Sequence, residues 1–143
     1  MARGRARGGE GEDAVTALVI DASAILAAIL GEAGGDAVFH RLDGAAVSAV
    51  NVAEVYTYAA LNDLPTDAID AFFADTGIEI AAFDHAQAVA AGGLAAVTRK
   101  AGLSLGDRSC LALARLRGAE VLTADRPWAA VAEAIGLSVT LLR

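Results

Sequence analysis

The chain has 143 residues and a mass of 14.4 kDa, which is room for one domain and one hydrophobic core. Hydrophobic residues make up 56% and charged residues 20%, so the composition favours a globular fold and excludes a disordered chain. A net charge of −7 argues against a polyanionic partner, but six of the eleven basic residues cluster within residues 99–126: Arg99, Lys100, Arg108, Arg115, Arg117 and Arg126.

Several other classes are excluded by the residues that the chain lacks. Its one cysteine, Cys110, rules out an intramolecular disulfide and a cysteine-cluster zinc site. No uncharged stretch approaches the roughly 18 apolar residues of a membrane-spanning helix, and residues 1–11 do not fit a secretory signal. We therefore expect a cytoplasmic protein, with residues 1–14 as a flexible extension and residues 15–143 as the folded domain.

From residue 17 onward, short apolar runs alternate with longer Ala-rich stretches. This pattern is typical of a parallel sheet covered by helices on both faces. It predicts strands over 17–21, 45–49, 78–83, 119–123 and 138–142. It predicts helices over 23–30, 36–42, 51–61, 66–76, 84–100, 105–117 and 127–135.

Local signals refine two of these helices. Ser104 with Asp107 three residues later is typical of a helix start, and Gly118 suits the left-handed backbone at a helix end. Both support the helix over 105–117. The pair Gly92-Gly93 lowers helix propensity inside the segment 84–100, which predicts that this helix bends or splits there.

Four acidic residues occupy similar places relative to the predicted strands. Asp21 closes the first strand, and Asp125 follows the fourth. Glu54 lies in the first turn of the helix after the second strand, and Asp107 lies in the first turn of the helix before the fourth. Because ligands bind beyond the carboxyl ends of strands in open parallel sheets, we expect all four acids at one end of the sheet.

Four converging carboxylates repel one another, and such a cluster persists by sharing protons or by binding cations. Oxygen ligands without cysteine or histidine select hard ions, Mg²⁺ or Mn²⁺. Such ions promote phosphodiester hydrolysis without a covalent nucleophile. Each acid alone also has a structural interpretation, because a carboxylate at a helix start is stabilised by the unpaired N–H groups there.

Polar and basic residues beside the acids are candidate supports. The hydroxyls of Ser23 and Thr123 could orient the carboxylates or bind phosphate, or could serve as an N-cap and an ordinary strand residue. Arg108 and Arg126 each follow a proposed ligand, so we predict that they lie at the rim and contact substrate phosphate. The alternative for both is a solvated surface charge.

Other notable side chains are expected to have structural roles. Cys110 is predicted to be a small core residue, since no histidine accompanies it to activate the thiol. His40 and His85 are expected at the surface. Packing in the core or in a dimer is expected for the aromatic residues Tyr56, Tyr58, Phe72, Phe73 and Trp128.

The sequence resembles the PIN-domain toxins of VapBC toxin–antitoxin systems in four stretches: VIDASAIL, VSAVNVAEV, GLSLGDRSCLALA and VLTADRPWA. They occur in the family's order and approximate spacing, and the resemblance spans Leu18 to Leu142. It implies a three-layer α/β/α sandwich with a central, mostly parallel five-stranded sheet. By match to these motifs, the metal-binding catalytic acids are Asp21, Glu54, Asp107 and Asp125, supported by Ser23, Asn51 and Thr123.

The same resemblance implies a Mg²⁺- or Mn²⁺-dependent endoribonuclease that acts as the toxin of a type II pair. It implies an RNA substrate, to which Arg108 and Arg126 are assigned as phosphate contacts. It further implies a cognate VapB-type antitoxin that occupies the active-site groove, and a homodimer.

Four alternatives are weighed at this point. One is a PIN nuclease that processes RNA or cleaves DNA. A phosphoacceptor signalling domain would need a lysine at the end of the last strand, whereas that strand reads SVTLLR and the only lysine is Lys100. A haloacid-type phosphatase would need an acid where Ser23 stands. The fourth alternative is a non-catalytic module, either metal-binding or purely structural, and a metal titration would distinguish the purely structural case.

Overall fold

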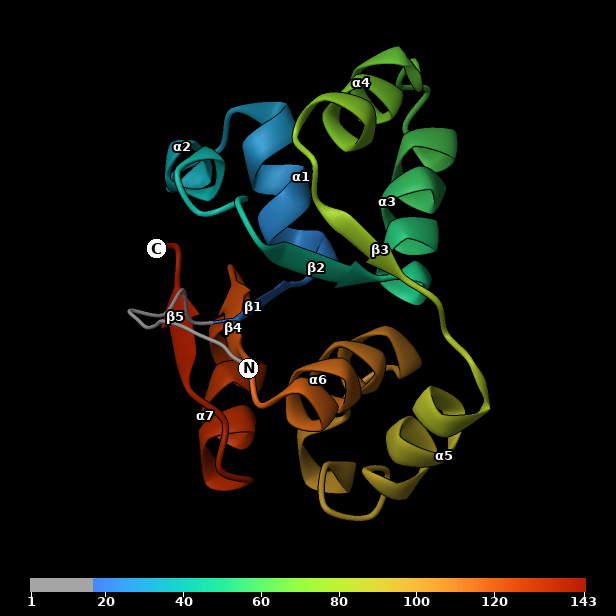
Figure 1. The fold of residues 1–143 in the computed structure, drawn as a ribbon, viewed down its shortest axis with the longest axis vertical. Coiled ribbons are helices and arrows are strands. Elements are labelled where there is room, and N and C mark those ends of the chain that lie inside the picture. The colour runs from blue at the N-terminus through green and yellow to red at the C-terminus, as the bar shows by residue number, and fades with distance from the viewer. Residues whose placement is uncertain (1–16) are drawn as a thin grey trace, which may run out of the picture.

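The structure, a computed structural model, describes residues 17–143, and Figure 1 shows its fold. The extension expected over residues 1–14 lies outside the described residues. The elements in chain order are β1 (Leu18–Ile20), α1 (Ala22–Leu30), α2 (Gly35–Phe39), β2 (Ala45–Ser48), α3 (Ala49–Leu61), α4 (Asp67–Asp75), β3 (Glu79–Ala81), α5 (His85–Gly93), η1 (Arg99–Ala101), α6 (Leu105–Arg117), β4 (Glu120–Thr123), α7 (Arg126–Ala134) and β5 (Val139–Leu141).

The five strands form one sheet in the order β3-β2-β1-β4-β5, and every neighbouring pair is parallel. The sheet predicted as mostly parallel is therefore parallel throughout. Helices α1 to α4 cover one face and α5 to α7 the other, as the upper and lower layers of Figure 1 show. This confirms the expected α/β class and its three layers.

Burial on both faces explains the apolar character of the strands. All residues of β1 and β2 are buried, as expected for inner strands of a parallel sheet. Successive residues of β1 enter different cores, because strand side chains alternate between faces. Ile20 packs with the α1–α4 layer, whereas Val19 packs with the α5–α7 layer.

The local sequence signals predicted the bounds of α6 and the interruption of the helix at the end of α5. Helix α6 spans the predicted residues, with a complete capping box between Ser104 and Asp107 and a left-handed Gly118 (φ 61°) at its end. The segment predicted as one helix over 84–100 is split: α5 ends at Gly93, and a 3₁₀ turn follows at Arg99–Ala101. The expected interruption near Gly92-Gly93 is thus confirmed.

The sheet reverses its winding between β1 and β4. Strand β1 leads into α1 on one face, whereas its neighbour β4 leads into α7 on the other face. The connections therefore diverge at the carboxyl ends of these two strands, which leaves a crevice where α/β proteins bind ligands.

None of the helices in residues 17–143 is both long enough and apolar enough to cross a bilayer.

Candidate active site

Asp21 lies at the carboxyl end of β1 and is the N-cap of α1, where its Oδ1 accepts from the Ala24 amide at 2.9 Å. Its side chain is almost enclosed, with 4% of the residue exposed. The Ser23 hydroxyl lies 2.8 and 2.9 Å from the two carboxylate oxygens, and the Thr123 hydroxyl donates to Oδ2 at 2.6 Å. Three donors therefore hold this carboxylate in one orientation.

Burial nevertheless dominates the ionisation of Asp21. Desolvation disfavours the charged carboxylate and raises the pKa of Asp21 from 3.8 to about 6. Hydrogen bonds from Thr123, Ala24 and Ser23 oppose this rise, and the negative charge of Asp107 adds to it. Asp21 thus titrates close to neutral pH in the absence of a counter-charge.

Ser23 and Thr123 also connect the end of β1 to the segment that follows β4. The Ser23 hydroxyl accepts from the Ala124 amide at 3.0 Å, and the Thr123 hydroxyl accepts from the Asp125 amide at 2.9 Å. Asp125 in turn caps α7 through a 3.4 Å contact from the Trp128 amide. These contacts fix Asp21 and Asp125 at the same edge of the sheet.

A second set of contacts joins α3 to the start of α6. The Asn51 side-chain amide donates to Glu54 Oε1 at 2.8 Å and to the Gly106 carbonyl at 3.0 Å. Gly106 packs directly on the Glu54 carboxylate, since a Cβ added at this position would lie 2.1 Å from Oε2. Only glycine leaves room for this close approach.

On α3, Asn51 has a buried side-chain oxygen without a hydrogen-bond donor among the described residues, and Glu54 has a raised pKa. The Asn51 side-chain oxygen is buried and accepts no hydrogen bond from the described residues, which leaves an acceptor available to a ligand or to water. Partial burial raises the pKa of Glu54; the Asn51 amide lowers it, and the charge of Asp107 raises it further. Asp107 itself accepts from the Ser104 amide at 3.0 Å within the capping box.

All four predicted acids line one pocket of about 270 Å³ together with two of the predicted supports. Thr123 lies directly behind it, bonded to Asp21. Tyr58, for which packing in the core or in a dimer was expected, lies in this wall, and the residue is 37% exposed. The complete lining is Asp21, Ala22, Ser23, Leu26, Asn51, Glu54, Tyr58, Asp107 and Asp125.

The carboxylates are not drawn together as tightly as a bound ion would require. Within residues 17–143, no three Asp, Glu, His or Cys side chains are grouped so that they could hold a metal ion as they stand. Asp21, Asp107 and Asp125 each accept a hydrogen bond from a backbone amide at a helix start. The donor chemistry still suits a hard cation, because the polar lining offers oxygen ligands and the unpartnered Asn51 oxygen.

The side chains of Arg126 and Arg108, the two predicted phosphate contacts, lie in different surroundings. Arg126 is exposed at the start of α7 and lines a pocket that adjoins the carboxylates. Arg108 instead donates to the Ala91 carbonyl at 3.0 Å, so its guanidinium is directed toward α5. Arg108 therefore does not line the carboxylate pocket in this structure, and its role as a phosphate contact stays a prediction.

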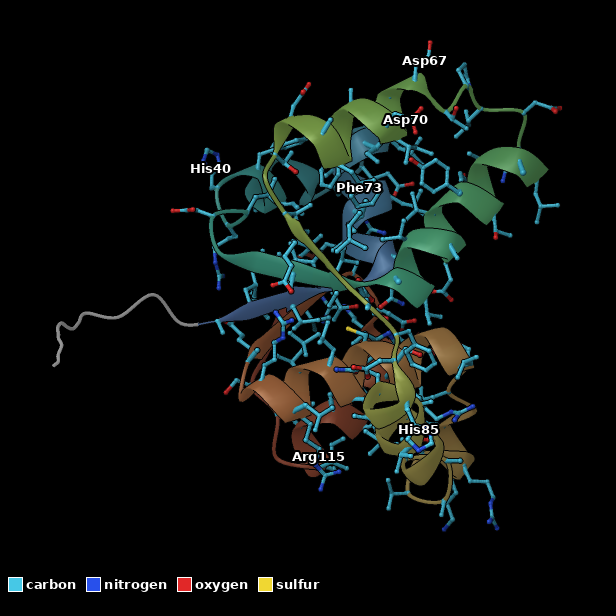
Figure 2. The ribbon with its side chains drawn as sticks, turned by 45° about the vertical axis from the view of Figure 1, so that its right-hand side comes forward. His40, Asp67, Asp70, Phe73, His85 and Arg115 are labelled. Carbon is cyan, nitrogen blue, oxygen red and sulfur yellow. The ribbon has the colours of Figure 1, made fainter. Side chains whose placement is uncertain are left out.

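The remaining side chains have the structural roles that were predicted. Cys110 and Trp128 are buried in the core of the α5–α7 layer. Burial, with the neighbouring carboxylates, raises the pKa of the Cys110 thiol well above its usual value, so it is not a nucleophile. His40 and His85 are exposed, on the outer surfaces of opposite layers in Figure 2.

The fold agrees with the comparison to known families. The PIN domain family model matches residues 18–134, and the chain therefore belongs to the PIN domain family. Comparison with curated protein sequences gives no match.

The fold also resembles solved structures of toxins and of toxin–antitoxin systems, all at low sequence identity. A toxin–antitoxin complex from Klebsiella pneumoniae matches with a TM-score of 0.62 at 18% identity over 88% of this chain and 98% of that chain. VapBC2 from Rickettsia felis, bound to a promoter DNA fragment, matches at 0.67 and 15% identity over 87% and 98%. VapC20 from Mycobacterium tuberculosis, a toxin that cleaves the sarcin–ricin loop, matches at 0.64 and 17% identity over 84% and 95%.

Proposed function

We propose that this chain is a Mg²⁺- or Mn²⁺-dependent endoribonuclease and the toxin of a type II toxin–antitoxin pair. One observation carries the proposal: Asp21, Glu54, Asp107 and Asp125 come from four separate segments and line one pocket at the reversal of the sheet. A purely structural role would not require four acids in one pocket, because their mutual repulsion costs stability. A cation offsets that repulsion.

The four acids are the proposed metal ligands, with Glu54 as a ligand or as the base that orients the attacking water. A bound divalent cation would supply the positive charge that neutralises phosphate oxygens and makes water more acidic. Ser23 and Thr123 keep the Asp21 carboxylate oriented, and Asn51 does the same for Glu54. Arg126 lies where it can contact RNA phosphate, whereas Arg108 would first have to release the Ala91 carbonyl.

The partners follow from the similar structures and from the resemblance in the motifs. Toxin–antitoxin complexes are among the solved structures that share this fold. We propose a cognate VapB-type antitoxin that covers the acidic pocket, and a homodimer of this chain. A PIN nuclease that processes RNA or cleaves DNA would use the same acids, so substrate and genetic tests must separate these functions.

The test of catalysis uses the purified chain with RNA and with DNA, in Mg²⁺, in Mn²⁺ and in EDTA. We expect RNA cleavage that needs the ion and is abolished by Asp21→Asn and by Asp107→Asn. Asp84→Asn is the matched control, because Asp84 also caps a helix, through the Gln87 amide, but does not line the pocket. Full activity of Asp21→Asn or Asp107→Asn would contradict the proposed site.

The test of the toxin role is expression in cells with and without the adjacent upstream gene. We expect growth arrest and RNA degradation when the chain is expressed alone, and rescue by the upstream product. Rescue should coincide with co-purification of the two proteins. Cleavage of RNA in vitro without any growth effect in vivo would favour an RNA-processing nuclease instead.

A further inference from the structure

A second pocket of about 460 Å³ adjoins the carboxylate pocket. The two pockets share Ser23 and Asp125 in their walls, so they lie side by side. Unlike the carboxylate pocket, the second one is lined by two arginine residues as well as by Asp125. Its lining is Ser23, Ala124, Asp125, Arg126, Pro127 and Arg143.

The neutral polar groups of this second pocket are largely engaged within the fold. The Ser23 hydroxyl lies within bonding distance of Asp21 and accepts from the Ala124 amide. Pro127 has no N–H, and the Trp128 amide already caps Asp125, so the start of α7 offers few free donors. Any anion in this pocket would therefore be recognised by the arginine side chains.

Arg143 follows β5, and its guanidinium contacts the segment between α1 and α2. The Leu142 amide donates to the Thr123 carbonyl at 2.9 Å, which ties the residue before Arg143 to the end of β4. Arg143 Nη1 donates to the Ala33 carbonyl at 3.0 Å and lies 3.5 Å from Glu32 Oε1. That ion pair is exposed, with 40% and 45% of the two side chains accessible, so it is weak; among residues 17–143, the contacts of this guanidinium involve Nη1 alone.

Arg126 faces the same pocket from the other side. It is exposed, and it makes no side-chain hydrogen bond or ion pair with the residues that the structure describes. A guanidinium presents a planar set of donors that matches two oxygens of a phosphate group. Two such groups beside an acidic pocket counteract, at this one place, the repulsion between a chain of net charge −7 and a polyanion.

We propose that Arg126 and Arg143 form a phosphate-binding subsite for the RNA strand. The subsite holds a backbone phosphate next to the phosphodiester group that the four acids cleave. This inference rests on the proposed function and adds to it a direction for the strand, from the carboxylate pocket toward β5 and α7. Arg143 is a substrate-positioning residue that no motif of the sequence indicated.

The experiment measures the binding of a labelled single-stranded RNA to the uncleaving Asp21→Asn chain in Mg²⁺, over a series of salt concentrations. Arg126→Ala and Arg143→Ala should each weaken binding by roughly tenfold. Each phosphate contact that is lost should reduce the slope of log K against log salt by about 0.7. Arg143→Lys, which keeps the charge but loses the planar fork, should be intermediate.

Arg115→Ala is the matched control, because Arg115 lies on the outer side of α6 in a different pocket and in the lower layer of Figure 2. It removes the same charge, so an effect equal to that of Arg143→Ala would show a general charge effect and would overturn the subsite. Thermal unfolding of each variant confirms that the fold is kept.

The subsite and the proposed function can fail separately. One outcome is that the unmutated chain cleaves RNA while Arg126→Ala and Arg143→Ala bind RNA as tightly as the Asp21→Asn chain in which they are made. In that case the subsite is wrong and the proposed nuclease function is retained. If the chain binds RNA through both arginines but cleaves nothing in any metal ion, the subsite stands and the catalytic proposal is wrong.

Discussion

Thr123 donates a 2.6 Å hydrogen bond to Asp21 Oδ2 across the boundary between β4 and β1, over a separation of 102 positions. The bond favours the ionised carboxylate and so opposes the effect of burial on its pKa. The same hydroxyl accepts from the Asp125 amide at 2.9 Å. Thr123 therefore acts on two of the proposed ligands at once.

We predict that Thr123→Val raises the pKa of Asp21 further above its present value of about 6, because the largest opposing hydrogen bond is lost. The variant should also lose about 1–2 kcal/mol of stability, since the Asp125 amide loses its acceptor. Carbon-13 NMR of the Asp21 carboxyl group during a pH titration measures the first effect. Thr140→Val is the control, because the Thr140 hydroxyl donates to Glu120 instead.

The raised pKa of Asp21 also gives a pH dependence of stability with a definite sign. Its pKa rises from 3.8 in the unfolded chain to about 6 in the fold, so the folded chain keeps a proton that the unfolded chain has lost. The stability from this group is complete below about pH 4 and is lost as the pH rises through 6. In the metal-free chain, ionised Asp21 thus destabilises the fold at pH 7.

Asp21→Asn should therefore be more stable than the unmutated metal-free chain at pH 7.5, by on the order of 1–2 kcal/mol. The two proteins should have similar stability below about pH 3, where Asp21 is protonated in both states of the unmutated chain. Urea unfolding in EDTA at both pH values measures the difference. An equal gap at the two pH values would mean that the substitution acts through packing rather than through charge.

The sequence predicted the fold well because its signals are local. The capping residues Ser104 and Gly118 set the bounds of α6, and the buried runs of β1 and β4 set the centre of the sheet. The predicted strands were one to three residues longer than those observed, since ladder pairing ends where the chain turns into a helix cap. Asp21 shows this, because it is the N-cap of α1 and not a strand residue.

The site could be predicted only in part, because side-chain directions depend on neighbours that are distant in sequence. Nothing local indicates that Asn51 bonds to Gly106, 55 positions away, or that Gly106 makes room for Glu54. The direction of Arg108 depends on the position of α5, and the place of Arg143 depends on the pairing of β5 with β4. Asp21 and Asp125 could be placed because they lie close to the ends of β1 and β4. Glu54, in contrast, lies in the second turn of α3 and not in the first as predicted, because the helix begins at Ala49.

We predict that Mg²⁺ and Mn²⁺ raise the melting temperature of the chain, since a ligand that binds only the folded state stabilises it. At ten times the dissociation constant the gain is about 1.4 kcal/mol, which corresponds to roughly 3–8 °C for a small domain. The gain should fall below about pH 6, where protonated Asp21 no longer attracts the ion. Scanning calorimetry in EDTA and in each ion measures it.

Glu54→Gln should reduce that thermal shift, whereas Glu133→Gln should not. Glu54 lines the pocket, while Glu133 is exposed on α7 and does not line it. Both substitutions remove one negative charge, so an equal loss in the two variants would indicate diffuse attraction of cations to an acidic protein. The same shift in all three proteins would remove Glu54 from the set of proposed ligands.

Gly106→Ala tests whether the contact between α3 and α6 shapes the site. The added Cβ would lie 2.1 Å from Glu54 Oε2, and the carboxylate, at the end of a flexible side chain, must swing away. We expect the fold to persist with a loss of about 1–2 kcal/mol, because the hydrogen bond from Asn51 to Glu54 breaks. The affinity for the cation and the rate of RNA cleavage should both fall, although the chain stays folded.

Gly92→Ala is the matched control for that substitution. Gly92 also lies in a helix, its backbone needs no positive φ, and an added Cβ meets no atom within 4 Å. Alanine there should stabilise the chain by about 0.5–1 kcal/mol and leave cation binding unchanged. If Gly106→Ala kept full cation affinity, the position of the Glu54 carboxylate would not matter to the ion, and Asp21, Asp107 and Asp125 would have to hold it without Glu54.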